Sequence, residues 1–310
     1  MALPAFPGSD RRMPRQPEAP WPLRTGPFHR QAAYELGMTR HHLAAHCWAR
    51  LFRDVFVHQE VELTAQRRLD ALRLAAPDGA ALVGRSAAWL FGIWTPPPGT
   101  LVPMEIALPT GGRRFDQRGV QAHRLVFDEG DLDDWDGVAV TTPERTCFGL
   151  MTRSSPTGAV VWADCFLHHD LVTAAGLRRY ADERPSWPHV RKVRDAVARA
   201  RAGAASPMET RLRLIIVDGG LPEPPLLNQP IYDANGRFLG VPDLGYDPPP
   251  FGIEYDGAYH EDAQQRAADN RRENGLLIAD FPLLRYGRYD VYNSPGRIVA
   301  EVRAMLNKAG

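Results

Sequence analysis

The N-terminal part of the chain changes from helical to alternating spacing of apolar residues. Residues 29–36 have helical spacing and are followed by a turn at Gly37. Thr39 is a suitable N-cap for a second helix over residues 39–50. Residues 49–58 alternate between apolar and polar positions, which is typical of strands. The order of two short helices and a hairpin predicts a winged helix-turn-helix.

The segment between residues 64 and 200 mixes both patterns and predicts a second, α/β domain. We expect helices over residues 64–76 and 82–94, strands within 102–109 and 119–127, and further helices from Thr142 to about Arg201. The start of the third helix is well marked, because Thr142 can cap it and Pro143 occupies its first turn.

The last third of the chain has the clearest alternation of helix and strand signals. Ser206 and Pro207 open a helix, and Asn235-Gly236 marks a hairpin turn within residues 228–246. An apolar strand over 251–260, a helix over 261–279 and a strand over 281–287 follow. We therefore expect an α/β (α+β) multidomain protein that ends in a mixed sheet flanked by helices.

Composition adds domain limits to this picture. A chain of 310 residues is long enough for two or three domains. We expect a flexible, proline-rich arm over 1–24, a winged helix over 25–63, the middle domain over 64–200 and the last domain over 201–310. No apolar run is long enough to span a membrane and no secretory signal opens the chain, so we expect a cytoplasmic protein without membrane contact. Its three cysteines have no metal-type spacing.

Charge is balanced overall but unevenly distributed. The first 60 residues carry eight arginines and five acidic residues, whereas residues 208–310 carry fifteen acidic and eleven basic residues. Only Lys192 and Lys308 are lysines, so nearly every cation is an arginine, which suits bidentate binding of phosphates and bases. A GC-rich genome is an alternative cause of the arginine excess.

The predicted winged helix places basic residues where such domains contact DNA. Arg40, His41 and His42 would open the recognition helix and read base edges. Arg50 and Arg53 would reach phosphates. A small helical hairpin without DNA binding is the alternative interpretation of the same pattern.

The predicted winged helix and the predicted middle domain resemble abortive-infection type IV antitoxins. Residues 28–60 resemble the N-terminal winged helix of that family, and the middle domain resembles its body, including the Thr-Pro-x-Arg-Thr element at residues 142–146. The resemblance implies operator DNA and a toxin as partners.

The candidate chemistry lies in the last domain. A hairpin would bring Asp243 beside Glu254, and Asp256 would share the face of Glu254 because side chains alternate along a strand. Glu209, in the first turn of the preceding helix, would complete the cluster. Carboxylates at that density suit Mg²⁺ or Mn²⁺, which lowers the pKa of a bound water. His260 would act as general base or orient that water.

Two arginines of the last domain have two interpretations. On the predicted helix over 261–279, Arg266 or Arg272 would bind the phosphate or orient a carboxylate.

A second group of possible metal ligands lies in the middle domain. Asp164, His168 and His169 are close in sequence and would suit a metal, but the absence of a third ligand at metal spacing favours ordinary polar helix surface.

The order of these residues resembles very-short-patch-repair endonucleases of the PD-(D/E)XK superfamily over about residues 205–306. The resemblance implies that Asp243 and Glu254 bind the metal, that Glu209 is the helix acid and that His260 lies near the cleavage centre. One departure matters: Asp256 occupies the position of the superfamily's lysine. Without the ordered set, the Glu-x-Asp-Gly string would be read as a strand that ends in a turn.

The leading hypothesis is a Mg²⁺-dependent nuclease that hydrolyses DNA and is guided by an N-terminal winged helix, in phage defence or DNA repair. The alternative is a DNA-binding regulator of the antitoxin class with a degenerate nuclease fold. RNA is a further candidate substrate, because a metal site does not distinguish sugars. A homodimer is also compatible with the sequence.

Overall fold

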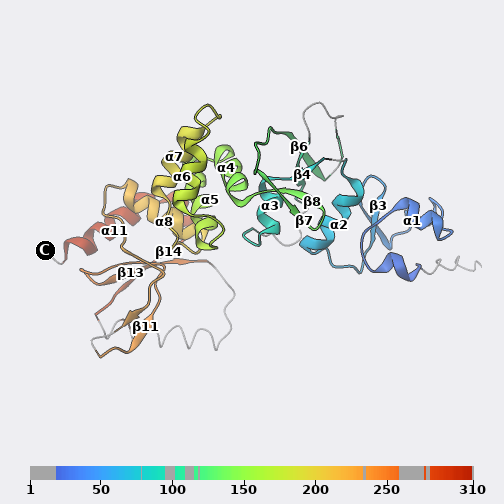
Figure 1. Cartoon of the computed structure of the whole chain (residues 1–310). Coiled ribbons are helices and arrows are strands. Elements are labelled where there is room, and N and C mark those ends of the chain that lie inside the picture. The colour runs from blue at the N-terminus through green and yellow to red at the C-terminus, as the bar shows by residue number, and fades with distance from the viewer. Residues whose placement is uncertain are drawn as a thin grey trace, which may run out of the picture. The chain divides into compact units, whose positions relative to one another are not determined.

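The computed structural model describes residues 19–77, 79–94, 102–108, 115–117, 119–232, 235–257, 276 and 280–308. The chain forms two compact units. The first comprises Met1–Leu82, Pro96–Val126 and Asp134–Ala139, and the second comprises Val83–Thr95, Phe127–Asp133 and Val140–Gly310. In the described residues helices alternate with four sheets, as the ribbons in Figure 1 illustrate, so the expected multidomain α+β fold is confirmed.

The N-terminal module is a three-stranded sheet with short helical turns. Its elements are η1 (Trp21–Arg24), β1 (Phe28–His29), α1 (Arg30–Glu35), η2 (His42–Ala44), β2 (Trp48–Phe52) and β3 (Val55–His58). The antiparallel strands have the order β1-β3-β2, and the predicted hairpin is β2–β3. Phe28 and Trp48 pack edge to face with ring centroids 5.2 Å apart, which holds the sheet together.

Two expectations for this module are wrong. Residues 1–18 of the expected flexible arm lie outside the described residues, and its last part is wrong because η1 forms there and Ala19 and Leu23 are buried in the module's core. A second helix over residues 39–50 is also absent. Thr39 does cap a turn, since its hydroxyl accepts a hydrogen bond from the His42 amide at 3.4 Å. The turn ends at Ala45, after which the chain joins the sheet.

After α2 (Ala65–Ala75), whose N-cap is Thr64, comes a five-stranded sheet. Its strands are β4 (Ala81–Leu82), β5 (Met104–Leu108), β6 (Val120–Arg124), β7 (Leu132–Trp135) and β8 (Val138–Thr141), in the order β6-β5-β4-β8-β7. The strands predicted within 102–109 and 119–127 are β5 and β6, which pair in parallel. Every residue of β5 is buried, including the charged Glu105, whose carboxylate lies 3.4 Å from His123 Nε2.

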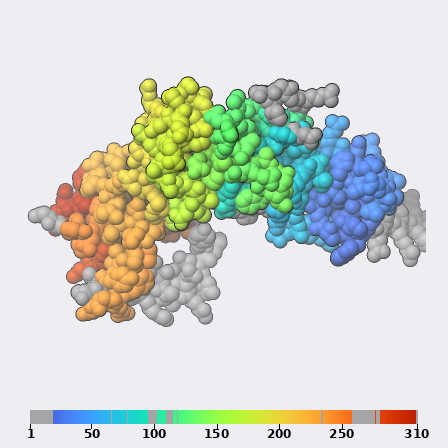
Figure 2. Space-filling view, viewed as in Figure 1, coloured from blue at the N-terminus to red at the C-terminus, as the bar shows by residue number. Residues whose placement is uncertain are grey.

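A helical core forms the first part of the second unit. It consists of α3 (Gly84–Leu90), α4 (Pro143–Arg153), α5 (Pro156–His168), α6 (Ala174–Asp182) and α7 (Val190–Arg199). As expected, Thr142 caps α4 by accepting a hydrogen bond from the Arg145 amide at 3.4 Å. Buried apolar side chains of α4 to α7 form one cluster. These helices are coloured green to yellow in Figures 1 and 2.

The C-terminal part of the second unit is a mixed sheet with helices. Its elements are α8 (Pro207–Asp218), β9 (Leu226–Leu227), β10 (Ile231–Tyr232), β11 (Phe238–Gly240), β12 (Leu244–Tyr246), β13 (Phe251–Asp256), β14 (Leu283–Gly287), α10 (Arg288–Asn293) and α11 (Pro295–Asn307). The main sheet has the order β14-β13-β12-β9. β12 and β13 form an antiparallel hairpin, and β14 lies parallel to β13 (Figure 1). The mixed sheet matches the expectation from the sequence.

Candidate functional site

The first turn of α8 holds Glu209 in a fixed position. Ser206 caps the helix by accepting a hydrogen bond from the Glu209 amide at 3.2 Å. The Glu209 side chain is buried, and its Oε2 accepts hydrogen bonds from the Ala205 amide at 2.8 Å and from Asn228 Nδ2 at 2.7 Å. Two donors on one carboxylate oxygen restrict its rotamer.

The hairpin β12–β13 places Asp243 opposite Glu254. Leu244 pairs with Ile253, so the residues just outside this pair are Asp243 and Glu254. Asp243 Oδ2 accepts a hydrogen bond from the Tyr255 amide at 2.7 Å, which holds the carboxylate beside the C-terminal part of β13. The Asp243 carbonyl accepts from the Asn228 amide at 3.0 Å. The two carboxylates therefore lie at the same end of the hairpin.

Glu254 has a basic partner on the neighbouring strand. The parallel register aligns Glu254 with Arg285 of β14, and Arg285 Nε lies 3.3 Å from Glu254 Oε2. Asp256, the next residue on the same face, is exposed and aligned with Gly287. Tyr255 faces the other way and packs against the apolar core, as the alternation predicts.

Asn228, which was not identified from the sequence, links the Glu209 carboxylate to the backbone of Asp243. Its side-chain amide donates to Glu209 while its backbone amide donates to the Asp243 carbonyl. Its φ of 51° lies in the left-handed region that asparagine tolerates better than most residues. Asn228 thus connects the first turn of α8 to the start of β12.

The acidic residues have the chemistry of metal ligands, but the described residues include no assembled metal cluster. The carboxylates of Asp243 and Glu254 are the oxygen ligands that Mg²⁺ and Mn²⁺ prefer. Within the described parts of the chain, no three His, Cys, Asp or Glu side chains are grouped as a metal site. His260, Arg266 and Arg272 lie outside the described residues.

Asp164 belongs to a buried ion pair, so its interpretation as polar helix surface is wrong. Its Oδ2 lies 2.8 Å from Arg213 of α8, and both side chains are 1% exposed. Thr210 and the Arg201 amide also donate to its carboxylate, at 2.9 and 2.7 Å. Burial raises the pKa of Asp164, and Arg213 opposes that rise. The Asp164 carboxylate therefore joins α5 to α8.

The two histidines near Asp164 do not share its interactions. His168 Nδ1 lies 3.3 Å from the Ala202 carbonyl, and His169 Nδ1 lies 3.0 Å from the Cys165 carbonyl. Each ring is thus oriented by a different backbone carbonyl.

The basic residues of the N-terminal module lie on its turns and hairpin. Arg40 and His41 are exposed on the turn before η2, and His42 is half-buried within it. They do not open an α-helix, because no α-helix is formed there. Arg50 is exposed on β2, and Arg53, with 78% of its side chain exposed, lies at the hairpin turn.

A cavity of about 800 Å³ adjoins the hairpin in the first unit. Its basic lining residues are Arg50, Arg53 and Arg68, the last from α2, and burial lowers the pKa of Arg68. Asp116 is its acidic lining residue, and the remaining lining is mostly apolar. The sequence did not predict this cavity, because its lining residues come from segments that are far apart along the chain. Gln117, for example, accepts a hydrogen bond from the Arg53 amide at 2.8 Å although it is 64 residues away in sequence.

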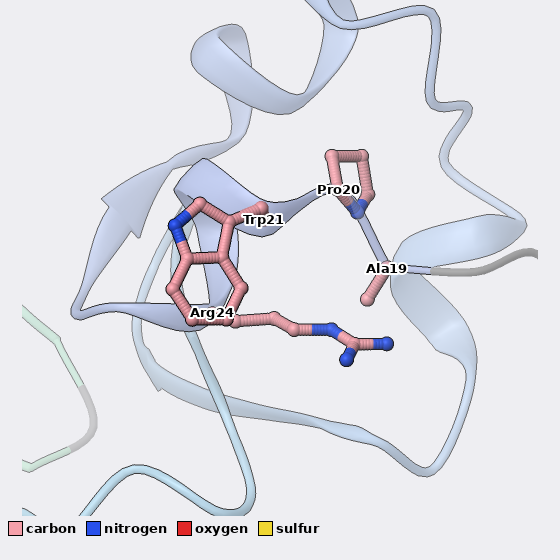
Figure 3. Close-up of a pocket in the computed structure, with 4 residues that line it drawn as sticks. All are labelled: Ala19, Pro20, Trp21 and Arg24. Atoms are coloured by element: carbon pink, nitrogen blue, oxygen red, sulfur yellow. The ribbon is translucent and has the colours of Figure 1, made fainter.

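A second, shallower pocket of about 360 Å³ lies beside η1. Figure 3 shows the four residues that line it, Ala19, Pro20, Trp21 and Arg24, with the Arg24 side chain extending from the indole towards Ala19. Trp21 is 75% exposed, so an aromatic face is open to solvent here.

The Thr-Pro-x-Arg-Thr element contributes Arg145 to a buried polar cluster around Asp131. Asp131 is 1% exposed and accepts a hydrogen bond from the Tyr180 hydroxyl at 2.6 Å. Arg145 and Arg184 approach the same carboxylate at 3.5 and 3.3 Å. Both guanidinium groups also lie over the ring of Trp187, at 4.9 and 5.2 Å from its centroid. The element therefore stabilises the helical core.

Comparison with known proteins supports the antitoxin resemblance of the middle region. Residues 80–196 match the family described as AbiEi antitoxin C-terminal domain. Two uncharacterized proteins of Mycobacterium tuberculosis, MT2308 and Rv2248, are each 24% identical over 261 residues, covering 84% of this chain and 93% of the relative. The crystal structure of the RV2827C protein from Mycobacterium tuberculosis matches this chain with 14% sequence identity and a TM-score of 0.38. The match covers 67% of this chain and 84% of that chain.

No helix in the described part of the chain is sufficiently long and apolar to cross a membrane.

Proposed function

We propose that this protein is a DNA-binding regulator of the antitoxin type. The observation that carries the proposal is the match of residues 80–196 to the AbiEi antitoxin C-terminal domain, preceded in the chain by a small module with exposed basic residues. The match covers β4 to α7, including the buried cluster around Asp131.

The N-terminal hairpin is the proposed contact with DNA. Arg50 and Arg53 are exposed on β2 and at its turn, and Arg40 and His41 are exposed on the turn before η2. Guanidinium groups on a narrow hairpin suit phosphate binding, which gives affinity without sequence information. The absence of a recognition α-helix in this module means that Arg40 and His41 would contact DNA from a turn.

A toxin is the proposed protein partner, and the matched region is its proposed binding site. An antitoxin of this kind would couple the two interactions, since DNA and toxin bind different parts of one chain. We expect this chain to bind DNA both upstream of its own gene and, more weakly, at unrelated sequences, because phosphate contacts dominate affinity.

The test compares wild type with the double variant Arg50→Gln/Arg53→Gln. Binding to a labelled duplex from upstream of the gene is measured by fluorescence polarisation over a range of salt concentrations. We expect at least tenfold weaker binding and a salt slope smaller by about 0.9 for each phosphate that the variant no longer neutralises. Arg303→Gln, an exposed arginine of α11, is the control. Equal isotherms for the double variant and the control would refute the hairpin contact.

A second candidate function is metal-dependent phosphodiester hydrolysis. It is favoured by the placement of Asp243 opposite Glu254, with Glu209 joined to them through Asn228. Mg²⁺ or Mn²⁺ would supply water activation and phosphate polarisation. Asp243 and Glu254 would hold the ion, Glu209 would orient the site or add a ligand, and Asp256 would take the position of the superfamily's lysine. His260 is proposed to orient the attacking water, and Arg266 and Arg272 to bind the phosphate.

Cleavage of plasmid, duplex and single-stranded DNA, and of RNA, with Mg²⁺ or Mn²⁺ tests this candidate. Asp243→Asn should abolish cleavage and leave duplex binding by the N-terminal module intact. Asp247→Asn is the matched control, because Asp247 lies exposed in the turn between β12 and β13. Absence of cleavage by wild type on all substrates would reject hydrolysis and leave the regulator. Sedimentation of the wild type with and without DNA would test the proposed homodimer.

A further inference from the structure

The face formed by α8 and α10 carries two exposed tyrosines between two arginines. Tyr289 is 71% exposed and Tyr292 is 50% exposed. They are three residues apart on α10, so they lie on the same side of the helix. Arg211 of α8 and Arg288 of α10 both lie over the Tyr292 ring, each with its guanidinium carbon 5.5 Å from the ring centroid. We call these four residues the arginine–tyrosine face.

The arginines of this face are held in place without an acidic partner. Among the described residues, no carboxylate forms an ion pair with Arg211 or Arg288. The nearest acid on α10, Asp290, is already engaged, since its oxygens accept from the Gly287 amide and from Arg297, both at 2.9 Å. The Tyr292 hydroxyl contacts Met208 Sδ at 3.8 Å, which helps to fix the ring.

The two guanidinium groups at the Tyr292 ring carry like charges, so together they attract an anion. A phosphate beside them would form charge-assisted hydrogen bonds with the guanidinium groups. The exposed Tyr289 ring offers flat apolar surface on the same helix. Phosphates alternating with flat rings are the chemistry of a nucleic acid strand.

We infer that the arginine–tyrosine face binds single-stranded nucleic acid, with a base stacked on the exposed Tyr289 ring and phosphates bound by Arg211 and Arg288, which lie over Tyr292. A single strand fits better than a duplex, because the base faces of a duplex are already stacked on each other. The face is separate from the N-terminal hairpin, so the inference goes beyond the proposed DNA contact of the regulator.

The face also lies at the end of the sheet that carries the acidic residues. α10 begins directly after Gly287, which is aligned with Asp256 of β13. Binding itself needs no metal, so it is measurable in EDTA whether or not the chain hydrolyses phosphodiesters.

The experiment measures binding of a fluorescein-labelled single strand of about 15 nucleotides, long enough for one such site, to the full chain in EDTA. Tyr289→Ser should lower the affinity for the single strand about tenfold, the typical effect of removing the platform for one stacked base. Tyr292→Leu removes the ring under both arginines, keeps an apolar side chain against Met208, and should also weaken binding. Arg211→Gln/Arg288→Gln should lower the salt slope by about 0.7 for each phosphate that the variant no longer neutralises.

Tyr232→Leu and Arg303→Gln are matched controls, because Tyr232 is also 56% exposed and Arg303 is an exposed arginine of α11. Tyr289→Ser provides a second variant whose folding should not depend on a side chain that is 71% exposed. Unchanged single-strand affinity in Tyr289→Ser and Tyr292→Leu would overturn the inference. So would equal decreases in affinity for single strand and duplex, or equal decreases in the controls.

The hairpin variant Arg50→Gln/Arg53→Gln separates this site from the proposed function. If the hairpin variant loses duplex binding and keeps single-strand binding, the two sites are independent, as inferred. If it loses both and the tyrosine variants lose neither, the arginine–tyrosine face is not a nucleic-acid site and the proposed regulator stands.

Discussion

Asp164 of α5 and Arg213 of α8 form an ion pair 2.8 Å long in which both side chains are 1% exposed. Arg213 extends the pair to Glu223 at 2.6 Å, and Glu223 also binds Arg201 at 2.7 Å. The chain thus joins its helical core to α8 through a buried polar network. The first turn of α8 carries Glu209, so this network also holds the helix that positions Glu209.

Breaking the pair should be costly. Asp164→Asn leaves the buried Arg213 with only one of its two carboxylate partners, Glu223, and we expect the free energy of unfolding to fall by about 3 kcal/mol. Urea denaturation followed by tryptophan fluorescence measures the change. Asp182→Asn is the control, because its pairs with Arg178 and Arg194 are partly exposed and should contribute at most about 1 kcal/mol. Equal destabilisation of both variants would contradict a special role for the buried pair.

The hydroxyl of Tyr180 should give a pH-dependent contribution to stability. Burial, together with the hydrogen bond to Asp131, raises the pKa of Tyr180 above its ordinary value. The folded state therefore keeps the proton after the unfolded state has lost it, and this contribution is fully present below about pH 10 and is lost as the pH rises above it.

Tyr180→Phe should lower the free energy of unfolding at neutral pH by about 1–3 kcal/mol, because Asp131 loses a buried donor. Above about pH 10 the difference between wild type and variant should shrink by up to about 1.4 kcal/mol per pH unit. Urea midpoints on both sides of that pH measure it, with Tyr232→Phe as a control for an exposed tyrosine. A difference that stays constant with pH would be the opposite result.

Local signals in the sequence were sufficient for the helix starts. Thr142-Pro143 and Ser206-Pro207 begin α4 and α8 because capping depends on residues within one turn. The hairpin that aligns Asp243 with Glu254 was predicted for the same reason, since a short turn joins its strands.

Long-range contacts explain what the sequence did not reveal. The helix expected over residues 39–50 is replaced by strand β2 because Trp48 packs on Phe28 and the Cys47 carbonyl accepts from Gln59. Asp164 has its partner 49 residues later, and Glu254 has Arg285 31 residues later. Neither pairing follows from spacing along the chain.

Gly252 is a position where a methyl group has no room. A Cβ there would overlap the Leu283 side chain and lie 3.0 Å from the Pro242 side chain. Gly252→Ala should therefore destabilise the C-terminal sheet by about 1–3 kcal/mol. Gly296→Ala in α11 is the matched control, since its Cβ would meet nothing within 4 Å and should be neutral or slightly stabilising. Urea denaturation of both variants measures the difference in their free energies of unfolding. A neutral Gly252→Ala would contradict tight packing between β13 and β14.

Arg285 offers a test of the metal candidate that does not depend on cleavage. Its guanidinium lies 3.3 Å from Glu254, so a dication bound by Glu254 would meet a positive charge within a few ångströms. Arg285→Gln should remove this repulsion and strengthen Mn²⁺ binding about tenfold, equivalent to roughly 1.4 kcal/mol at high effective dielectric. Titration calorimetry measures the affinity, with Arg297→Gln as the control, because Arg297 pairs with Asp290 and Glu301 instead. If Mn²⁺ binds equally to both variants, Glu254 is not a ligand; if only Arg285→Gln binds more tightly, the carboxylate opposite Asp243 holds the ion even in a chain that cuts nothing.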